Sequence, residues 1–211
     1  ENLLVVPRQD LLQSAALTEP LACGWHAARL GLRLQDGPVS GLTCVVLGGG
    51  AIGVGAALCL SAMGVHDITL IEVNPLRLET LHGIAGFEAT DGNDASAPVP
   101  SSADLVIDGV GFASTRTSAC ELAKPGGVIC HIGLGSGEGG VDVRRLTLQE
   151  ITFIGTYTYT PQDFRDTGAA IFAGQLGPLD WVETRPLSEG QAAFEDIRNG
   201  RTPAPKIILI P

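Results

Sequence analysis

The sequence predicts an α/β fold, a doubly wound parallel sheet with helices on both faces. Short runs of β-branched and apolar residues alternate with segments of helical periodicity along most of the chain, which favours parallel strands joined by right-handed crossovers. Several of these runs are apolar throughout, as expected of strands that are buried on both faces. Glycine follows several of them directly, which suits a tight turn into the next helix.

Composition narrows the class of protein. The 211 residues are 45% hydrophobic and 17% charged, which is typical of a globular chain of about one domain. No apolar run reaches the roughly 18 to 20 residues that span a bilayer, so no membrane partner is expected. The formal net charge of −10 argues against a nucleic-acid partner, because binding to phosphates requires clustered lysine and arginine.

The five cysteines lie among apolar neighbours and form no C-x-x-C pair: Cys23, Cys44, Cys59, Cys120 and Cys130. This pattern is typical neither of a zinc ribbon nor of a disulfide framework. We expect buried free thiols in a reducing compartment, and therefore a cytoplasmic protein.

The individual elements follow from apolar periodicity and from turn residues. Predicted strands cover residues 42–47, 67–72, 87–90, 104–111, 126–135, 151–159 and 206–210. Predicted helices cover residues 18–32, 51–64, 75–81, 114–124, a segment from Pro161 onward, and 188–200. The first helix is expected to start near Ser14, and Gly64 is expected to close the second. Asn74 is expected to open the third, and Ser188 to cap the last. Residues 91–103 are rich in Asp, Ser, Pro and Ala and are expected to form a loop.

The stretch "LTCVVLGGGAIGVG", residues 42–55, carries the clearest functional signal. Gly48, Gly50 and Gly53 form G-x-G-x-x-G directly after a strand and at the opening of a helix. Gly48 permits the tight turn, Gly50 lets the backbone approach a diphosphate, and Gly53 lets the helix pack close to the strand. The free N–H groups at the helix start, at Ala51 and Ile52, favour the diphosphate. A plain strand-to-helix turn would not need all three glycines.

Glu72 ends the second strand, 19 residues after Gly53. An acidic side chain at this place accepts hydrogen bonds from the adenosine ribose hydroxyls, and its charge repels a 2′-phosphate, so NAD is predicted in preference to NADP. The alternative is a surface glutamate at a strand end. Arg77 either reaches the adenine or only interacts with solvent from its helix.

Two other nucleotide-using classes fit less well. A methyltransferase usually has an acidic residue within the glycine motif, whereas this turn is wholly apolar. A short-chain dehydrogenase needs a Tyr-x-x-x-Lys pair, and neither Tyr157 nor Tyr159 has a lysine four residues on.

The chain resembles the nucleotide-binding half of the medium-chain, zinc-type alcohol dehydrogenase family, and in particular the polyol dehydrogenases. The resemblance rests on "SAALTEPLACGWHAARLG", "VVLGGGAIGVGAAL", "LIEVNPLRLE", "LVIDGVG", "KPGGVICHIGLG" and "PKIILIP" in this order. It implies a Rossmann domain over residues 18–211 that binds NAD, with residues 1–17 leading in from a preceding catalytic domain. It also implies an oxidoreductase that uses zinc in the intact enzyme, with no catalytic residue in this chain and therefore no hydride transfer by this chain alone.

Further site residues are implied by the resemblance alone. Glu19 in "EPLA" matches a glutamate that ligates the catalytic zinc or hydrogen-bonds its water; the alternative is an acid at a helix start. Lys206 matches a basic residue near the diphosphate; the alternative is a solvated lysine. Three segments match those that surround the nicotinamide in the family. Val110 and Gly111 match the segment at the nicotinamide ribose, and Ile132, Gly133 and Leu134 match the loop that holds the carboxamide. Thr156 and Thr158 match a segment that also reaches the nicotinamide.

The resemblance also implies an architecture and a reaction. Many relatives carry a helix where residues 91–103 form a loop, so the adenine side of the pocket is expected to differ. The strand at 151–159 is expected to pair across a homodimer. The implied activity is hydride transfer between a polyol or other secondary alcohol and NAD. The alternatives are a non-catalytic module that senses NAD or serves as a scaffold, and a zinc-free quinone-reductase relative, against which Glu72 and "EPLA" both count.

Overall fold

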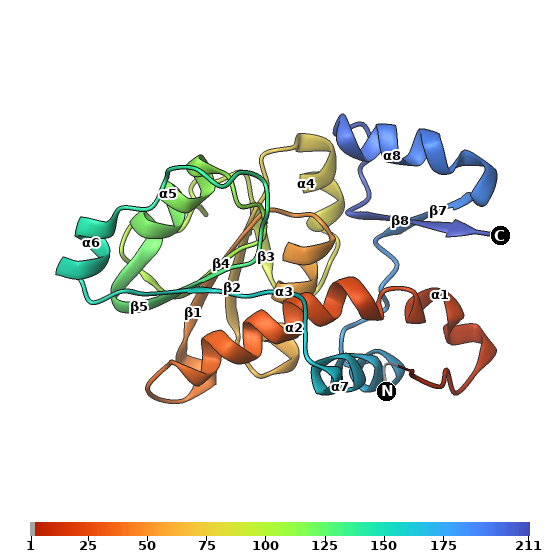
Figure 1. The fold of residues 1–211 in the computed structure, drawn as a ribbon, viewed down its shortest axis with the longest axis horizontal. Coiled ribbons are helices and arrows are strands. Elements are labelled where there is room, and N and C mark those ends of the chain that lie inside the picture. Colours follow the sequence, from red (N-terminus) through yellow and green to blue (C-terminus); the bar gives the residue numbers. More distant parts are fainter. Residues whose placement is uncertain (1–2) are drawn as a thin grey trace.

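The computed structural model describes residues 3–211 and contains a six-stranded parallel sheet (Figure 1). The strand order is β3-β2-β1-β4-β5-β6, and every neighbouring pair is parallel. The strands are β1 (Thr43–Leu47), β2 (Asp67–Ile71), β3 (Glu88–Thr90), β4 (Ala103–Asp108), β5 (Ala123–His131) and β6 (Thr152–Gly155). The first strand, β1, lies in the middle of the sheet. β2 and β3 follow toward one edge, and β4, β5 and β6 then follow toward the other edge.

Helices cover both faces of this sheet, as predicted. On one face α2 (Thr18–Arg33) and α3 (Ala51–Ala62) pack against the strands, and α7 (Pro161–Phe172) packs on α2. On the other face α5 (Ala113–Leu122) lies against β4 and β5. The remaining helices are η1 (Gln9–Leu11), α1 (Leu12–Ala15), η2 (Val39–Gly41), α4 (Pro75–Leu81), α6 (Val143–Leu148), η3 (Leu187–Glu189) and α8 (Gly190–Arg198).

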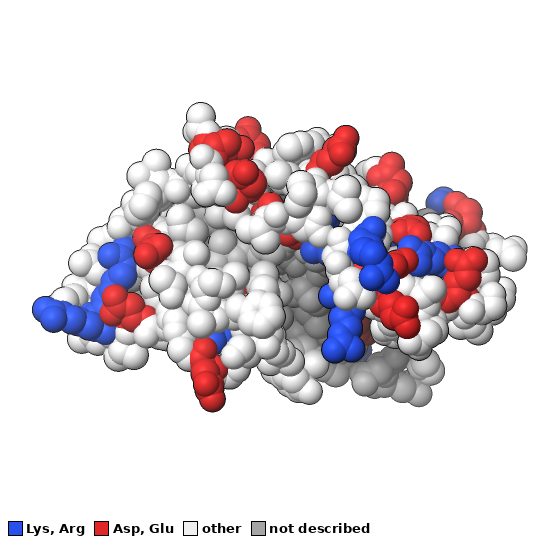
Figure 2. All heavy atoms as spheres, turned by 90° about the horizontal axis from the view of Figure 1, so that it is seen from above, with Lys and Arg blue, Asp and Glu red and all other residues white. Residues whose placement is uncertain are grey.

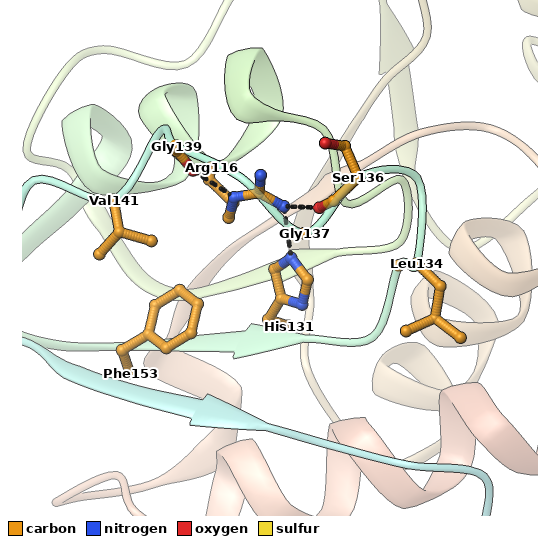
Figure 3. Close-up of a pocket in the computed structure, with 9 residues that line it drawn as sticks. Arg116, His131, Leu134, Ser136, Gly137, Gly139, Val141 and Phe153 are labelled. Carbon is orange, nitrogen blue, oxygen red and sulfur yellow. Dashed lines mark hydrogen bonds between the residues drawn. The ribbon is translucent and has the colours of Figure 1, made fainter.

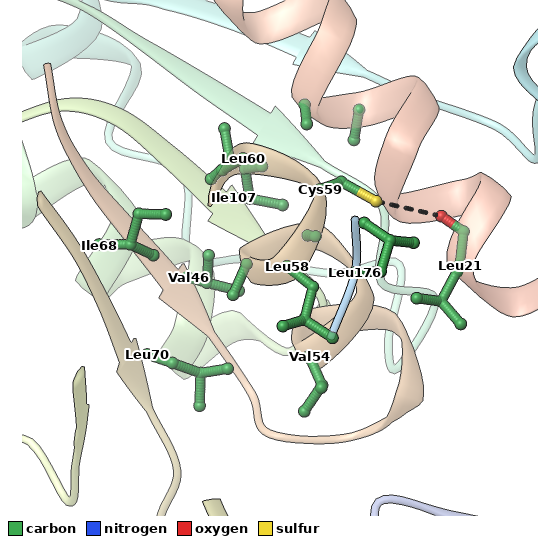
Figure 4. Close-up of a cluster of buried hydrophobic side chains, with 14 of the residues drawn as sticks. Leu21, Val46, Val54, Leu58, Cys59, Leu60, Ile68, Leu70, Ile107 and Leu176 are labelled. Atoms are coloured by element: carbon green, nitrogen blue, oxygen red, sulfur yellow. Dashed lines mark hydrogen bonds between the residues drawn. The ribbon is translucent and has the colours of Figure 1, made fainter. Parts of the chain in front are cut away.

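The two faces of β1 serve two separate cores. Cys44 and Val46 belong to the larger cluster beneath α2 and α3, whereas Val45 and Leu47 belong to the cluster beneath α5. This division follows from the two-residue period of a strand. Figure 4 shows the larger cluster, in which side chains of the sheet meet apolar side chains of α3. An apolar strand is stable here because both of its faces are covered.

A second, two-stranded parallel sheet lies beside the first (Figure 1). It pairs β7 (Val182–Pro186) with β8 (Lys206–Ile210), and η3 and α8 connect the two strands. The predicted strand at 206–210 is confirmed, but β7 has no counterpart among the predicted strands. Its five residues "VETRP" are polar and partly exposed, so they lack the apolar run that marks the central strands.

Several predicted boundaries were wrong. The strands predicted at 104–111 and 126–135 are Ala103–Asp108 and Ala123–His131, and the helix predicted at 114–124 is Ala113–Leu122. Three further elements differ from their predictions in a way that has a local reason. The strand predicted at 151–159 is only the four-residue β6, because Thr156 and the residues after it turn away toward α7. The helix predicted from Ser14 is two helices, with a break before Thr18. Ser188 caps no helix, since it lies inside the 3-10 turn η3 that precedes α8.

Two predicted caps are confirmed. The Asn74 side chain accepts hydrogen bonds from the backbone N–H groups of Leu76 and Arg77, and Gly64 follows α3 with a φ of +97°.

Charged side chains are unevenly spread over the surface shown in Figure 2. Blue and red side chains lie next to one another on the right of this view, over the second sheet and α8. In this part of the chain Arg185 pairs with Glu183 and Asp196, and Arg201 also pairs with Asp196. Within residues 3–211, no helix is both long enough and apolar enough to cross a membrane.

Candidate functional site

The candidate site lies where the carboxyl ends of β1, β2 and β4 meet. Because successive crossovers leave β1 in opposite directions, the sheet opens a crevice at this edge, as parallel α/β sheets do at their switch point. A cavity of about 840 Å³ occupies it. Five of the predicted site residues line this cavity: Gly48, Gly50, Glu72, Arg77 and Val110.

The turn after β1 has the geometry that its glycines predict. Gly48 has a φ of +95°, and its N–H donates to the Ile71 carbonyl oxygen at 2.8 Å. A Cβ at Gly53 would overlap the Gly48 carbonyl oxygen, whereas a Cβ at Gly50 would have no neighbour within 4 Å. The open side of Gly50 therefore leaves room for a ligand against the backbone.

The start of α3 offers free hydrogen-bond donors. Gly50 is its N-cap and contributes no side chain, so the first N–H groups of the helix, at Ala51 and Ile52, have no capping acceptor. This arrangement fits a diphosphate, since the positive end of the helix dipole adds to the free donors.

Glu72 points its carboxylate at the glycine turn. The side chain is buried, and its two oxygens accept hydrogen bonds from the backbone N–H of Gly49 at 2.9 Å and from that of Asn74 at 2.7 Å. The surface-glutamate alternative is therefore wrong. Glu72 also lines the large cavity, together with Gly48 and Gly50 of the glycine turn.

Arg77 does not extend into solvent. Its Nη1 donates to Glu72 Oε2 at 3.0 Å, while its buried Nε has no hydrogen-bond partner among residues 3–211. A buried donor without a partner is costly. The Nε group is therefore available to an acceptor on a ligand in this cavity, which Arg77 also lines.

The loop at 91–103 forms one wall of the cavity. Asp91, Gly92, Asn93, Pro98 and Pro100 all line it. The loop contains turns and bends but no helix before β4 begins at Ala103, as predicted.

Five of the residues predicted around the nicotinamide, from Val110 to Gly111 and from Ile132 to Leu134, lie on two loops that touch each other. A Cβ at Gly111 would overlap the backbone of Gly133, and the reverse is also true. Ile132 lies beside Gly133, and Leu134 is 85% exposed at the tip of the second loop. The N–H of Thr156 donates to the His131 carbonyl oxygen at 2.9 Å, which ties a third segment to the same place.

Thr158 and Lys206 stand apart from this arrangement. Thr158 is exposed and has a left-handed φ of +48°, which is uncommon for a β-branched residue. Lys206 is the first residue of β8 in the second sheet and is absent from the residues that line the large cavity.

Glu19 lies exposed in the first turn of α2, near Cys23 and Tyr159. Burial, and next the Glu19 carboxylate, raise the pKa of the Cys23 thiol to about 11 and that of the Tyr159 phenol above its usual value. Within residues 3–211 no group of three His, Cys, Asp or Glu side chains is arranged to hold a metal ion. The described residues do not by themselves form a zinc site.

Three residues of this region were not predicted as site residues: Asp108, Arg116 and His131. Asp108 ends β4, is fully buried, and accepts hydrogen bonds from the N–H groups of Val110 and Gly111 at 3.0 and 2.9 Å. An acid at the end of an apolar strand, before glycine, could have indicated this role. Arg116 and His131 lie on a second cavity of about 530 Å³ beside the Gly133 loop (Figure 3).

The strand order, the glycine turn and the crevice at the switch point define an α/β domain of the Rossmann class. Residues 51–173 match the zinc-binding dehydrogenase family, and the chain belongs to that family.

Individual relatives agree with this assignment. The chain is 28% identical over 165 residues to a sorbitol dehydrogenase of Arabidopsis thaliana, covering 73% of this chain and 44% of the relative. It is 25% identical over 203 residues to a D-xylulose reductase of Saccharomyces cerevisiae, covering 90% of this chain and 56% of the relative. The chain therefore spans about half the length of these curated relatives.

A solved structure extends the comparison to the fold. The acetophenone reductase of Geotrichum candidum, determined in complex with NAD, superposes with a TM-score of 0.78 over 92% of this chain and 54% of that one. The two sequences are 21% identical, so the likeness is one of fold.

Proposed function

We propose that this chain is the NAD-binding part of a zinc-dependent dehydrogenase that transfers hydride between a polyol or other secondary alcohol and NAD. The observation that carries the proposal is the buried Glu72 carboxylate beside the glycine turn, on the wall of a cavity large enough for the adenosine half of the cofactor. The names of the relatives, which include a sorbitol dehydrogenase and a D-xylulose reductase, support the substrate class.

Each predicted residue has a task in this proposal. The N–H groups of Gly50, Ala51 and Ile52 hold the diphosphate, and Glu72 accepts hydrogen bonds from the adenosine ribose while Arg77 keeps its carboxylate in place. Val110, Gly111 and the 132–134 loop hold the nicotinamide half. NAD, when bound, supplies the hydride acceptor.

Four residues and two properties complete the proposal. Thr156 and Thr158 approach the nicotinamide, and Lys206 approaches the diphosphate. Glu19 contributes a carboxylate oxygen to a zinc site whose other ligands lie outside this chain. We also propose a homodimer through β6 and a cytoplasmic location. The location is supported by four buried free thiols, two of which, at Cys44 and Cys130, have their pKa raised to about 12 by burial.

The choice of cofactor provides the direct test. We expect calorimetric titration of the 211-residue chain to give an NADP affinity about tenfold or more below that for NAD, because the 2′-phosphate carries nearly two negative charges and would lie next to Glu72. Glu72→Gln removes the charge and should narrow this difference. Glu88→Gln on the neighbouring strand β3 is the control and should leave the preference unchanged. Comparable affinity of the natural chain for both cofactors would contradict the role of Glu72.

A further inference from the structure

Arg116 is a buried cation held by backbone carbonyl groups. It lies in the first turns of α5 and is 5% exposed. Its Nε donates to Gly139 O at 2.6 Å, its Nη1 donates to Gly111 O and Ser136 O at 2.8 Å each, and its Nη2 donates to Glu138 O at 2.5 Å. Among residues 3–211 no carboxylate forms an ion pair with it.

This geometry makes the guanidinium a link between two loops. A buried charge is costly unless its donors are satisfied, and here the acceptors are the carbonyl ends of peptide groups in the Gly111 loop and in the 136–139 segment. The planar guanidinium of arginine can donate to all of these carbonyl oxygens at once, whereas the ammonium group of a lysine cannot. In Figure 3 the Arg116 side chain lies between Gly139 and Ser136, above His131.

The same loops are held from the other side by Asp108. Its carboxylate accepts from the N–H of Gly111, and its backbone carbonyl accepts from the N–H groups of Ile132 and Gly133 at 2.9 and 3.0 Å. Both backbone polar groups of Gly111 are thus held, its N–H by the Asp108 carboxylate and its carbonyl oxygen by Arg116. The N–H of Ser136 also donates to Gly111 O at 2.9 Å.

We propose that Arg116 is a positioning residue that holds the 132–136 loop against the Gly111 loop and thereby sets the 132–136 loop for the nicotinamide ring of the cofactor. This inference rests on the proposed function, because the same function assigns these loops to the nicotinamide. The large cavity beside Glu72 is lined by neither Arg116 nor the 132–136 loop, whereas Gly109, Val110 and Phe112 of the Gly111 loop do line it. We therefore expect the adenosine half to depend less on this link than the nicotinamide ring does.

The test compares two ligands, NAD and ADP-ribose, which share the adenosine diphosphate and the second ribose and differ only by the nicotinamide ring. In calorimetric titrations of the full chain, Arg116→Gln should weaken NAD binding about tenfold, while ADP-ribose affinity stays within about twofold. Arg116→Lys should weaken NAD binding similarly, because it keeps the charge and loses the fork.

Arg145 offers a matched control. Its guanidinium also donates to backbone carbonyl oxygens, those of Cys120, Glu121 and Ala123, but at the far end of α5. Arg145→Gln should leave the ratio of NAD to ADP-ribose affinity unchanged. Equal weakening of both ligands in Arg116→Gln would indicate a merely structural role and would overturn the inference, as would no weakening.

Failure of the inference can be told from failure of the proposed function. If the natural chain binds neither ligand, the proposed function is overturned and the inference falls with it. If it binds both with equal affinity, dinucleotide binding stands and only the inference is overturned.

Where Arg116→Gln does not fold, hydrogen exchange of the natural chain gives the second measurement. NAD should slow exchange of the amides at 132–136 and ADP-ribose should not; equal protection by both ligands overturns the inference.

Discussion

At the scale of single residues, Gly50 and Gly53 lie three positions apart in one turn and face opposite surroundings. A Cβ at Gly53 would overlap the Gly48 carbonyl oxygen. This oxygen belongs to the backbone, so it cannot move aside as the end of a flexible side chain could. Gly50 faces open space in the cavity, and its φ of −75° is accessible to any residue. The same pattern of glycines therefore serves packing at one position and ligand access at the other.

This contrast gives a prediction for two alanine variants. Gly53→Ala should lower the free energy of unfolding by about 2 to 3 kcal/mol, because the added methyl group overlaps the backbone. Gly50→Ala should change stability by no more than about 0.5 kcal/mol and should weaken NAD binding, because its methyl group occupies the approach of the diphosphate. Urea unfolding and calorimetric titration measure the two effects. Unchanged NAD affinity in Gly50→Ala would contradict the placement of the diphosphate.

The interactions of Glu72 follow only partly from its position in the sequence. Its place at the end of β2 is visible in the sequence, and so is the acid itself. Its burial and its three hydrogen bonds, from Gly49, Asn74 and Arg77, are visible only in the fold.

At the scale of elements, a buried carboxylate joins α2 to α7. Asp163 lies in the first turn of α7 and is 1% exposed. Its oxygens accept hydrogen bonds from Arg29 Nε at 2.6 Å, from Thr160 Oγ1 at 2.6 Å, and interact with His26 Nδ1 at 2.8 Å. Burial opposes ionisation, but these hydrogen bonds together outweigh it and hold the pKa of the Asp163 carboxyl well below its usual value.

The direction of this pKa shift predicts an acid dependence. Because the pKa is lower in the folded than in the unfolded chain, where it is about 3.9, the stabilisation is complete above that value and is lost as the pH falls toward the folded pKa. Asp163→Asn should lower the free energy of unfolding by about 3 kcal/mol at pH 7, and by less below pH 4. Urea unfolding over this pH range measures the difference.

Asp166 on the same helix provides the control for this prediction. Its carboxylate accepts a hydrogen bond from Gln162 at the surface. Asp166→Asn should change the stability by about 0.5 kcal/mol or less. A loss in Asp163→Asn that is equally large at pH 3 and pH 7 would show that ionisation of Asp163 does not contribute.

At the scale of the whole molecule, the order of the strands decides which backbone groups remain unpaired. The sheet ends in β3 on one side and in β6 on the other, so each presents a free edge in the single chain. The proposed homodimer uses the edge of β6, which the resemblance places at the subunit boundary. The observed β6 has four residues, so the pairing segment is shorter than the 151–159 strand that the sequence predicts.

Charge at these edges tests the proposed dimer. Thr152 is exposed on β6, and Thr152→Lys should shift the sedimentation mass from dimer to monomer, because a charged side chain disfavours edge-to-edge pairing. Glu88→Lys replaces an anion by a cation on the opposite edge, β3, and should leave the mass unchanged. A natural chain that sediments as a monomer, or a dimer that Glu88→Lys disrupts instead, would contradict pairing through β6.

The sequence by itself determined the central strands, the turn after β1 and the acid that follows β2. These features are local: an apolar run, a glycine that permits a positive φ, and a capping Asn74 act through neighbours a few residues away. The same reasoning missed β7, since a polar edge segment becomes a strand only when its partner, here β8, is beside it.

Only the tertiary structure decided which distant residues meet. The Arg116 guanidinium reaches Gly139, the Arg29 side chain reaches Asp163, and the Asn74 amide donates to the Gly200 carbonyl oxygen at 2.9 Å. No local pattern specifies such contacts, because their partners lie 23 to 134 residues apart and are brought together by the order of the strands. The candidate site at the carboxyl ends of β1, β2 and β4 therefore depends on the fold as much as on the residues of the glycine motif.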